Sequence, residues 1–343
     1  MTSTTIAPST PQPVGQPRWK RLPILSHLRK SVGLQRTMLV IGLVLSGIFF
    51  LTAIFAPLIA PYGYAQAAEG TDRFGSQVAP SAAHIWGTTV GGYDVFSRVV
   101  WGAQTAALVI ILGVLLSIFA GVILGLVSGY LGGWVDRVLV VVADAIYAFP
   151  ALLLAIVMSI VISGGQSSLF GGIMAAAISI TVVFIPQYFR VARAETIRLK
   201  AEPFVESAKV IGTSNIRIIA RHVFPNATRT MPLIFTLNAA ESILTLAGLG
   251  FLGFGIEPTS ASEWGYDLNK ALSDATSGIW WTGLFPGLAI VLTVLGLTLV
   301  GESMNDLNDP RLRGRRRAGR NKRRGGNVPT TADVDGTGME AAK

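Results

Sequence analysis

Long uncharged stretches alternate with short charged ones along this chain. Positions 99–135 carry no charged side chain over 37 residues, and positions 145–189 carry none over 45. A helix needs about 20 apolar residues to cross a bilayer, so the second stretch must hold two crossings, divided at residues 163–168. The pattern predicts an all-α integral membrane protein with six transmembrane helices. We place them at residues 37–60, 103–128, 136–162, 171–192, 229–253 and 282–302.

Composition supports this reading. Hydrophobic residues make up 51% of the chain, charged residues 14%, and the mean hydropathy is +0.54, whereas a soluble domain carries about 25% charged residues. The chain has no cysteine, which excludes disulfides and cysteine-based metal sites. His27, His84 and His222 stand apart without the spacing of a metal site, and we expect no bound metal.

The distribution of positive charge predicts the orientation in the membrane. Six Lys and Arg residues precede the first predicted span, one lies between the second and third, eight lie between the fourth and fifth, and ten follow the last. These 25 of 28 residues fall on one face, which the positive-inside rule assigns to the cytoplasm. Both termini are therefore predicted to be cytoplasmic. Because the charges occupy loops of alternate spans, nucleic acid is not expected as a partner.

Three regions follow from this pattern. Residues 1–36 form a cytoplasmic tail whose basic amphipathic segment either lies on membrane lipid, the reading we favour, or is solvated. Residues 37–310 form the transmembrane domain, and residues 311–343 form a basic disordered tail.

A polar insert at residues 202–226 interrupts the apolar pattern on the cytoplasmic side. Pro203 suits the first turn of a helix, and Gly212 can adopt the positive φ that ends one near Ile211. Thr213 or Ser214 can then cap a second helix, which Pro225 breaks. The insert is predicted to be a helix-turn-helix elbow, with Phe204, Ala208 and Ile211 on one face of its first helix. A loop resting on lipid headgroups is the alternative.

The spacing of this insert is similar to a known motif. Glu206-x-Ala208-x₃-Gly212, followed by His222-x₂-Pro225-Asn226, resembles the EAA loop of ABC importer permeases, with Ser207 where that family usually has Ala. The resemblance implies that residues 202–226 are a coupling loop that docks on a cytoplasmic ATPase. The residues that it implicates are Phe204, Glu206, Ser207, Ala208, Gly212, His222 and Pro225.

Four further blocks extend the resemblance to the C-type permeases for dipeptides, oligopeptides and nickel. They lie at residues 86–105, 129–150, 241–265 and 285–311, with Thr89 and Tyr93 as departures from the first block. The resemblance implies a type I ABC importer permease fold in the bacterial inner membrane. It also implies a second homologous permease subunit, two ATPase subunits and an extracytoplasmic substrate-binding protein that delivers a dipeptide, an oligopeptide or nickel.

No lysine in the chain follows a glycine, so a GxxxxGK[ST] phosphate loop is absent. The chain cannot be its own P-loop ATPase, and we expect a non-catalytic permease subunit. ATP and Mg²⁺ would be bound by the partner ATPases, and this chain needs no cofactor.

Two acidic residues fall inside predicted spans. Asp144 and Glu241 are costly there and are candidates for pore-facing groups, although a structural hydrogen bond to a neighbouring helix is an alternative for both. A proton-coupled secondary transporter would use them as a proton relay, and a purely structural membrane protein would not need them. Pro150, Pro186 and Pro232 are predicted to kink their spans.

Overall fold

A computed structural model describes residues 34–163 and 169–308. The predicted N-terminal region lies outside the described residues except for residues 34–36, and the predicted C-terminal tail lies wholly outside them. The chain divides into two compact units, residues 37–302 and the two chain ends taken together. The packing contacts described below all lie within residues 37–302.

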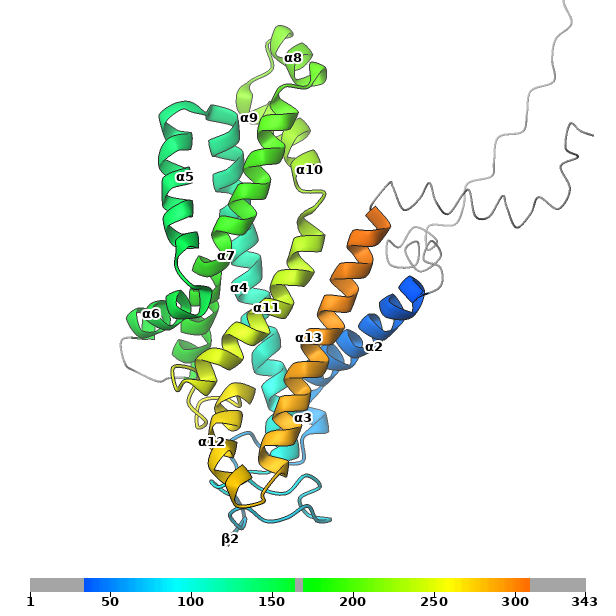
Figure 1. Ribbon diagram of the computed structural model, residues 1–343, viewed down its shortest axis with the longest axis vertical. Coiled ribbons are helices and arrows are strands. Elements are labelled where there is room, and N and C mark those ends of the chain that lie inside the picture. Colours follow the sequence, from blue (N-terminus) through cyan, green and yellow to red (C-terminus); the bar gives the residue numbers. More distant parts are fainter. Residues whose placement is uncertain (1–33, 164–168, 309–343) are drawn as a thin grey trace, which may run out of the picture. The chain divides into compact units, whose positions relative to one another are not determined.

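Helices dominate the structure (Figure 1). Five are long and apolar enough to cross a membrane: α2 (Leu34–Ile54), α4 (Val95–Leu131), α7 (Leu169–Lys200), α11 (Met231–Phe251) and α13 (Trp281–Asn308). A sixth crossing results if α5 (Gly133–Ala148) and α6 (Ala151–Ser163) count as one broken span. The predicted all-α membrane fold is therefore confirmed.

The remaining elements are short and lie in the connections. They are α3 (Ala56–Ile59), the antiparallel strands β1 (Ala68–Glu69) and β2 (Asp72–Arg73), α8 (Pro203–Val210), α9 (Asn215–Ile218), a π-helical turn (Ile219–Val223), α10 (Phe224–Ala227) and α12 (Trp264–Thr276).

Proline positions account for two differences from the predicted spans. The predicted span 136–162 is two helices bent by 99°, because Pro150 lacks a backbone N–H and its ring clashes with the preceding turn. The predicted span 37–60 likewise stops at Ile54, and Pro57 lies in the first turn of α3. Pro232 occupies the first turn of α11 and so does not kink it, which corrects the prediction. Pro186 lies inside α7, which continues past it.

Helices α4 and α7 are longer than predicted. They contain 37 and 32 residues, which at about 1.5 Å per residue gives roughly 55 and 48 Å, well beyond a hydrocarbon core of about 30 Å. The sequence underestimated them because their ends carry polar and charged residues. Both helices therefore continue outside the membrane.

A stripe of small residues lets α4 and α7 touch along their backbones. Gly113, Ser117, Gly121, Gly125 and Gly129 recur every fourth residue of α4 and form one face. A methyl group on Gly121, Gly125 or Gly129 would lie only 2.7–2.8 Å from a backbone carbonyl oxygen of α7. The Ser117 hydroxyl donates across the contact to the Thr181 carbonyl at 3.1 Å. Such small residues at every fourth position permit the closest helix approach in membranes.

We predict that Gly125→Ala lowers the stability of the folded protein. Its methyl group would lie 2.7 Å from the Phe189 carbonyl and 2.7 Å from Ala192 Cβ, and such overpacking costs about 1–3 kcal/mol. Gly47→Ala is the matched control, because nothing lies within 4 Å of its added methyl group. Thermal unfolding of the detergent-solubilised protein measures both, and equal midpoints would contradict the prediction.

Candidate functional site

The first half of the predicted elbow is α8, which begins at Pro203 as predicted. It ends in a full Schellman motif, with the Thr213 N–H donating to Ala208 and the Gly212 N–H donating to Lys209. Gly212 has φ +77°, the left-handed conformation that the motif requires at this position. The predicted role of Gly212 in turning the chain is therefore confirmed.

The second half of the elbow is one continuous helical segment built from α9, the π-helical turn and α10. Ser214 occupies the N-cap position of α9 with extended backbone but makes no side-chain capping bond. Pro225 lies in the first turn of α10, directly after the π-helical turn that ends at Val223. The wider turn accommodates a proline that an unbroken α-helix would exclude. Pro225 thus modifies the segment without ending it.

The two halves pack against each other and the membrane domain through an inner face. Val205 and Ala208 are buried, whereas Phe204 is only half-buried, with its ring centroid 6.3 Å from that of His222. Phe204, Ala208 and Ile211 therefore do not share one environment, contrary to the prediction that they form a common face. Ala208 packs inside the chain and Ile211 faces outward.

The outer face of the elbow combines aliphatic and charged side chains. Val210, Ile211 and Ile216 are 82, 79 and 81% exposed, and we call these three residues the elbow tip. Glu206, Ser207 and Lys209 are exposed beside them. Three large aliphatic side chains at one exposed turn form the kind of apolar patch that marks a docking surface.

Tyr130, near the end of α4, holds the elbow in place. Its hydroxyl donates to Asn215 Oδ1 at 2.8 Å, and its carbonyl accepts from Lys200 Nζ at 2.6 Å. The ammonium groups of Lys200 and Lys209 lie 5.5 and 5.8 Å from its ring centroid. This one buried tyrosine, which the sequence analysis missed, therefore contacts both halves of the elbow and the end of α7.

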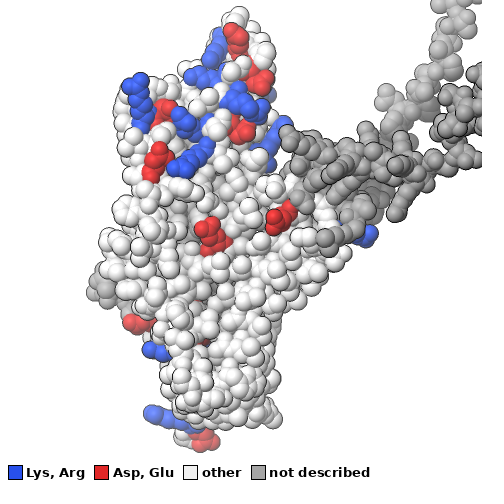
Figure 2. Space-filling view, viewed as in Figure 1, with Lys and Arg blue, Asp and Glu red and all other residues white. Residues whose placement is uncertain are grey.

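Charge is concentrated at the elbow end of residues 37–302. Figure 2 shows Lys and Arg side chains gathered over this end, with acidic residues among them and an almost uncharged surface beneath. Arg193 of α7 pairs with Asp136 of α5, with 2.7 Å between Nη2 and Oδ2. An ion pair here holds α5 against α7 where the charged region begins.

The two acidic residues predicted inside spans have different surroundings. Asp144 pairs with Arg190 of α7 at 2.8 Å, so the predicted bond to a neighbouring helix is present, although the pair remains exposed. Glu241 is exposed on α11, and its carboxylate makes no hydrogen bond or ion pair with any residue between 34 and 163 or 169 and 308.

At the opposite end of α4, a buried ion pair joins the start of the helix to α12. Arg98 Nε lies 2.8 and 3.0 Å from the two carboxylate oxygens of Asp267, and its Nη1 donates to the Tyr64 carbonyl at 2.9 Å. Both charged side chains are at least 90% buried. Arg98 lies in the first block of the family resemblance, but its partner could not be predicted from the sequence because it lies 169 residues away.

Indole groups reinforce this junction. Trp264 donates to the Val99 carbonyl at 3.0 Å and Trp281 to the Thr88 carbonyl at 3.2 Å. Glu263 caps α12 by accepting the backbone N–H groups of Gly265 and Tyr266 at 2.7 and 2.8 Å. Burial raises the pKa of the Glu263 carboxyl to about 8 despite these two bonds.

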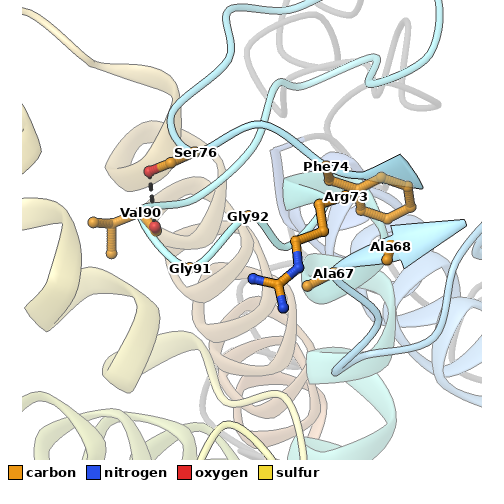
Figure 3. Close-up of a pocket in the computed structure, with 8 residues that line it drawn as sticks. All are labelled: Ala67, Ala68, Arg73, Phe74, Ser76, Val90, Gly91 and Gly92. Atoms are coloured by element: carbon orange, nitrogen blue, oxygen red, sulfur yellow. Dashed lines mark hydrogen bonds between the residues drawn. The ribbon is translucent and has the colours of Figure 1, made fainter. Parts of the chain in front are cut away.

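An open cavity of about 380 Å³ lies among the loops at this end. Figure 3 shows Arg73 extending into it between Ala67 and Gly92, while the Ser76 hydroxyl donates to the Val90 carbonyl at 2.8 Å. The cavity has one charged side chain on its wall and no cluster of converging polar groups. Across the described residues, no three His, Cys, Asp or Glu side chains lie close enough together to hold a metal ion.

Comparisons with known proteins match this arrangement. Residues 121–314 match the family described as binding-protein-dependent transport system inner membrane component. Residues 34–79 match the N-terminal TM domain of oligopeptide transport permease C. The glutathione transport system permease protein GsiD of Shigella flexneri serotype 5b (strain 8401) is 39% identical over 267 residues, which cover 78% of this chain and 84% of that protein. GsiD of Escherichia coli O157:H7 is 36% identical over the same coverage.

We predict that Glu263→Gln changes how stability depends on pH. A carboxyl group with a folded pKa of about 8 and an ordinary unfolded pKa of about 4.3 holds a proton in the folded state that the unfolded chain lacks. This group therefore makes stability fall as pH rises between those two values, and the Gln variant removes that contribution.

The check is the unfolding midpoint of the solubilised protein from about pH 5 to about 9. The midpoint of the parent protein minus that of the Glu263→Gln variant should decrease as pH rises. Glu257→Gln, which removes an exposed carboxylate from the same loop, should give a flatter difference. A flat difference for Glu263→Gln would contradict the raised pKa.

Proposed function

The chain belongs to the family of inner membrane components of binding-protein-dependent transport systems, and from this premise we propose that it forms half of the pore of an ATP-driven importer of small peptides. It is a multi-pass, non-catalytic permease subunit of a bacterial ABC importer. The proposal adds the route of the substrate, the coupling surface and the partners.

The elbow carries the coupling part of the proposal. Its inner face packs inside the chain, while the elbow tip (Val210, Ile211 and Ile216) stays 79–82% exposed at the basic end. Burying each such side chain in a groove is worth about 1.5–3 kcal/mol. We infer that the basic end is cytoplasmic and that residues 202–226 dock on an ATPase subunit.

The coupling residues predicted from sequence divide into two groups in this proposal. Glu206, Ser207 and the elbow tip contact the ATPase, whereas Ala208, Gly212 and Pro225 shape the elbow that presents them. Phe204 and His222 lie between the halves and contribute to both. In this proposal residues 1–36 and 311–343 are cytoplasmic tails, and residues 37–310 form the permease domain.

An importer of this class works with ATPase and substrate-binding partners. We propose two ATPase subunits and a second homologous permease subunit. The exposed carboxylate of Glu241 on α11 supports the presence of a second permease subunit. If this chain stood alone, that carboxylate would face lipid at a cost of a few kcal/mol. Its exposed side therefore faces the partner permease or the water-filled path between the two.

The substrate class rests on the relatives. The permease protein at 39% identity is named for glutathione transport, and the N-terminal match is to an oligopeptide permease. We propose a short peptide as substrate, with nickel as the alternative within the same class. A proton-coupled transporter remains the alternative from another class, and it leaves the exposed elbow tip without a role.

Uptake by the whole complex, reconstituted in proteoliposomes with its binding protein, tests the function. Labelled di-, tri- and pentapeptides should accumulate only with ATP, and vanadate should stop accumulation. Collapse of uptake by an uncoupler while ATP is maintained would favour the proton-coupled alternative instead. Accumulation of nickel without accumulation of any peptide would contradict the proposed peptide substrate and favour nickel instead.

We predict that Glu206→Lys uncouples ATP hydrolysis from uptake. The substitution reverses the charge on the docking face and places a cation in the first turn of α8, where the helix dipole favours an anion. Peptide uptake should fall about tenfold or more, the loss expected for one charge-assisted contact, while the chain still inserts. Asp72→Lys, a charge reversal on the exposed β hairpin, should transport normally. Normal uptake by Glu206→Lys would contradict the proposal.

Gly212 offers a second test of the elbow. Gly212→Val should abolish coupling, because a β-branched residue is strongly disfavoured at φ +77°. Gly212→Asn is the matched control, since asparagine tolerates this conformation and nothing lies within 4 Å of an added Cβ. ATP-driven uptake should be near normal for Asn and lost for Val, and similar rates for the two would show that the elbow geometry does not matter.

A further inference from the structure

A cavity of about 180 Å³ lies where α5 bends into α6. Its walls come from four elements of this chain, namely α5, α6, α7 and α11. Three of them contribute aromatic or polar groups: Tyr147 and Phe149 at the bend, Phe184 and Gln187 on α7, and Glu241 on α11. Glu241 is the middle residue of α11, a 21-residue candidate membrane span, so we place this wall of the cavity at membrane depth.

Two of the polar side chains that line the cavity have no partner among the described residues. Neither the Glu241 carboxylate nor the Gln187 amide makes a hydrogen bond or ion pair with another residue that the structure describes. A carboxylate inside a membrane is costly unless it meets a cation, a hydrogen-bond donor or water. The site therefore has unused capacity to accept hydrogen bonds from a ligand.

The charges around the cavity favour a cation. Tyr147 joins the cavity to the neighbouring ion pair, because the Arg190 guanidinium carbon lies 4.2 Å from its ring centroid and Arg190 pairs with Asp144 at 2.8 Å. Arg190 and Asp144 neutralise each other, so Glu241 leaves one net negative charge. The exposed aromatic rings of Tyr147 and Phe149 also attract ammonium groups.

The size of the cavity limits what it can hold. A site that encloses a whole small-molecule ligand has about 300–1,000 Å³, and this cavity has about 180 Å³. It can take one end of a peptide but not the whole molecule. The remainder of the peptide would lie in the path outside the cavity, which the exposed Phe149 borders.

We propose that this cavity binds the protonated amino terminus of the peptide during its passage, with Glu241 as the counter-ion and Gln187 as a hydrogen-bonding partner. The proposal rests on the proposed function and adds the chemical group that the pore recognises. A salt contact with the second permease is the competing role for Glu241. The concave, aromatic surroundings favour a ligand, because a subunit contact would need a protruding group from the partner to enter the same cavity.

The first experiment compares uptake by complexes carrying Glu241→Gln and Glu241→Asp. Gln removes the charge and should lower the rate of tripeptide uptake about tenfold or more, the value of a charge-assisted hydrogen bond. Asp restores the charge and should recover most of the rate. Full uptake by the Gln variant overturns the proposal, and so does loss of the second permease subunit on purification of that variant.

The second experiment detects the ligand directly and needs no transport. The chain has no cysteine, so Phe149→Cys places a single thiol of this chain at the cavity wall. Its labelling by a maleimide dye is measured in the purified complex, without nucleotide and after trapping with ATP and vanadate. Trialanine should slow labelling in at least one state, whereas N-acetyl-trialanine should not. Val141→Cys, on α5 and 67% exposed, should label equally fast throughout.

Adding Glu241→Gln to the Phe149→Cys variant should abolish the protection. Equal protection by the two peptides, or none by either, overturns the proposal. Because labelling is read without uptake, these outcomes are independent of the test of the proposed function. A complex that transports peptides but shows no protection would support the importer function and contradict the proposed amino-terminus site.

Discussion

Because glycine or serine occupies every fourth position of α4 from Gly113 to Gly129, the backbones of α4 and α7 touch along most of their shared length. Each end of this pair then fixes a different part of the protein. Arg98 and Asp267 join the start of α4 to α12, and Tyr130 joins its end to the elbow. The pair therefore connects the loops at one end to the elbow at the other.

The two ends of α4 hold their partners with different kinds of interaction. Arg98 and Asp267 are buried and bonded through several atoms, and removing one partner of such a pair is strongly destabilising. Tyr130 instead donates one hydrogen bond from its hydroxyl to Asn215, and its carbonyl and ring face contact the Lys200 ammonium group. The loop end is thus joined through a buried ion pair, whereas the elbow end is joined through contacts of a single tyrosine.

Much of the fold could be read from the sequence, because uncharged runs of 37 and 45 residues leave few alternatives to membrane helices. The elbow was also accessible, since Pro203 and Gly212 impose local backbone geometry. The interactions that position the helices and the elbow relative to each other could not be predicted from the sequence. Arg98 finds Asp267 169 positions away and Tyr130 finds Asn215 85 positions away. Local spacing contains no signal for such pairs.

The π-helical turn at Ile219–Val223 sets the relative orientation of the helical faces on either side of it. A π turn holds one residue more than an α-helical turn, so the side chains that follow it point about 100° away from where an unbroken α-helix of the same sequence would place them. Deleting one residue from this turn would therefore rotate the faces of α9 and α10 relative to each other by that angle while the segment stays helical. The direction in which the elbow presents α9 thus depends on a single inserted residue.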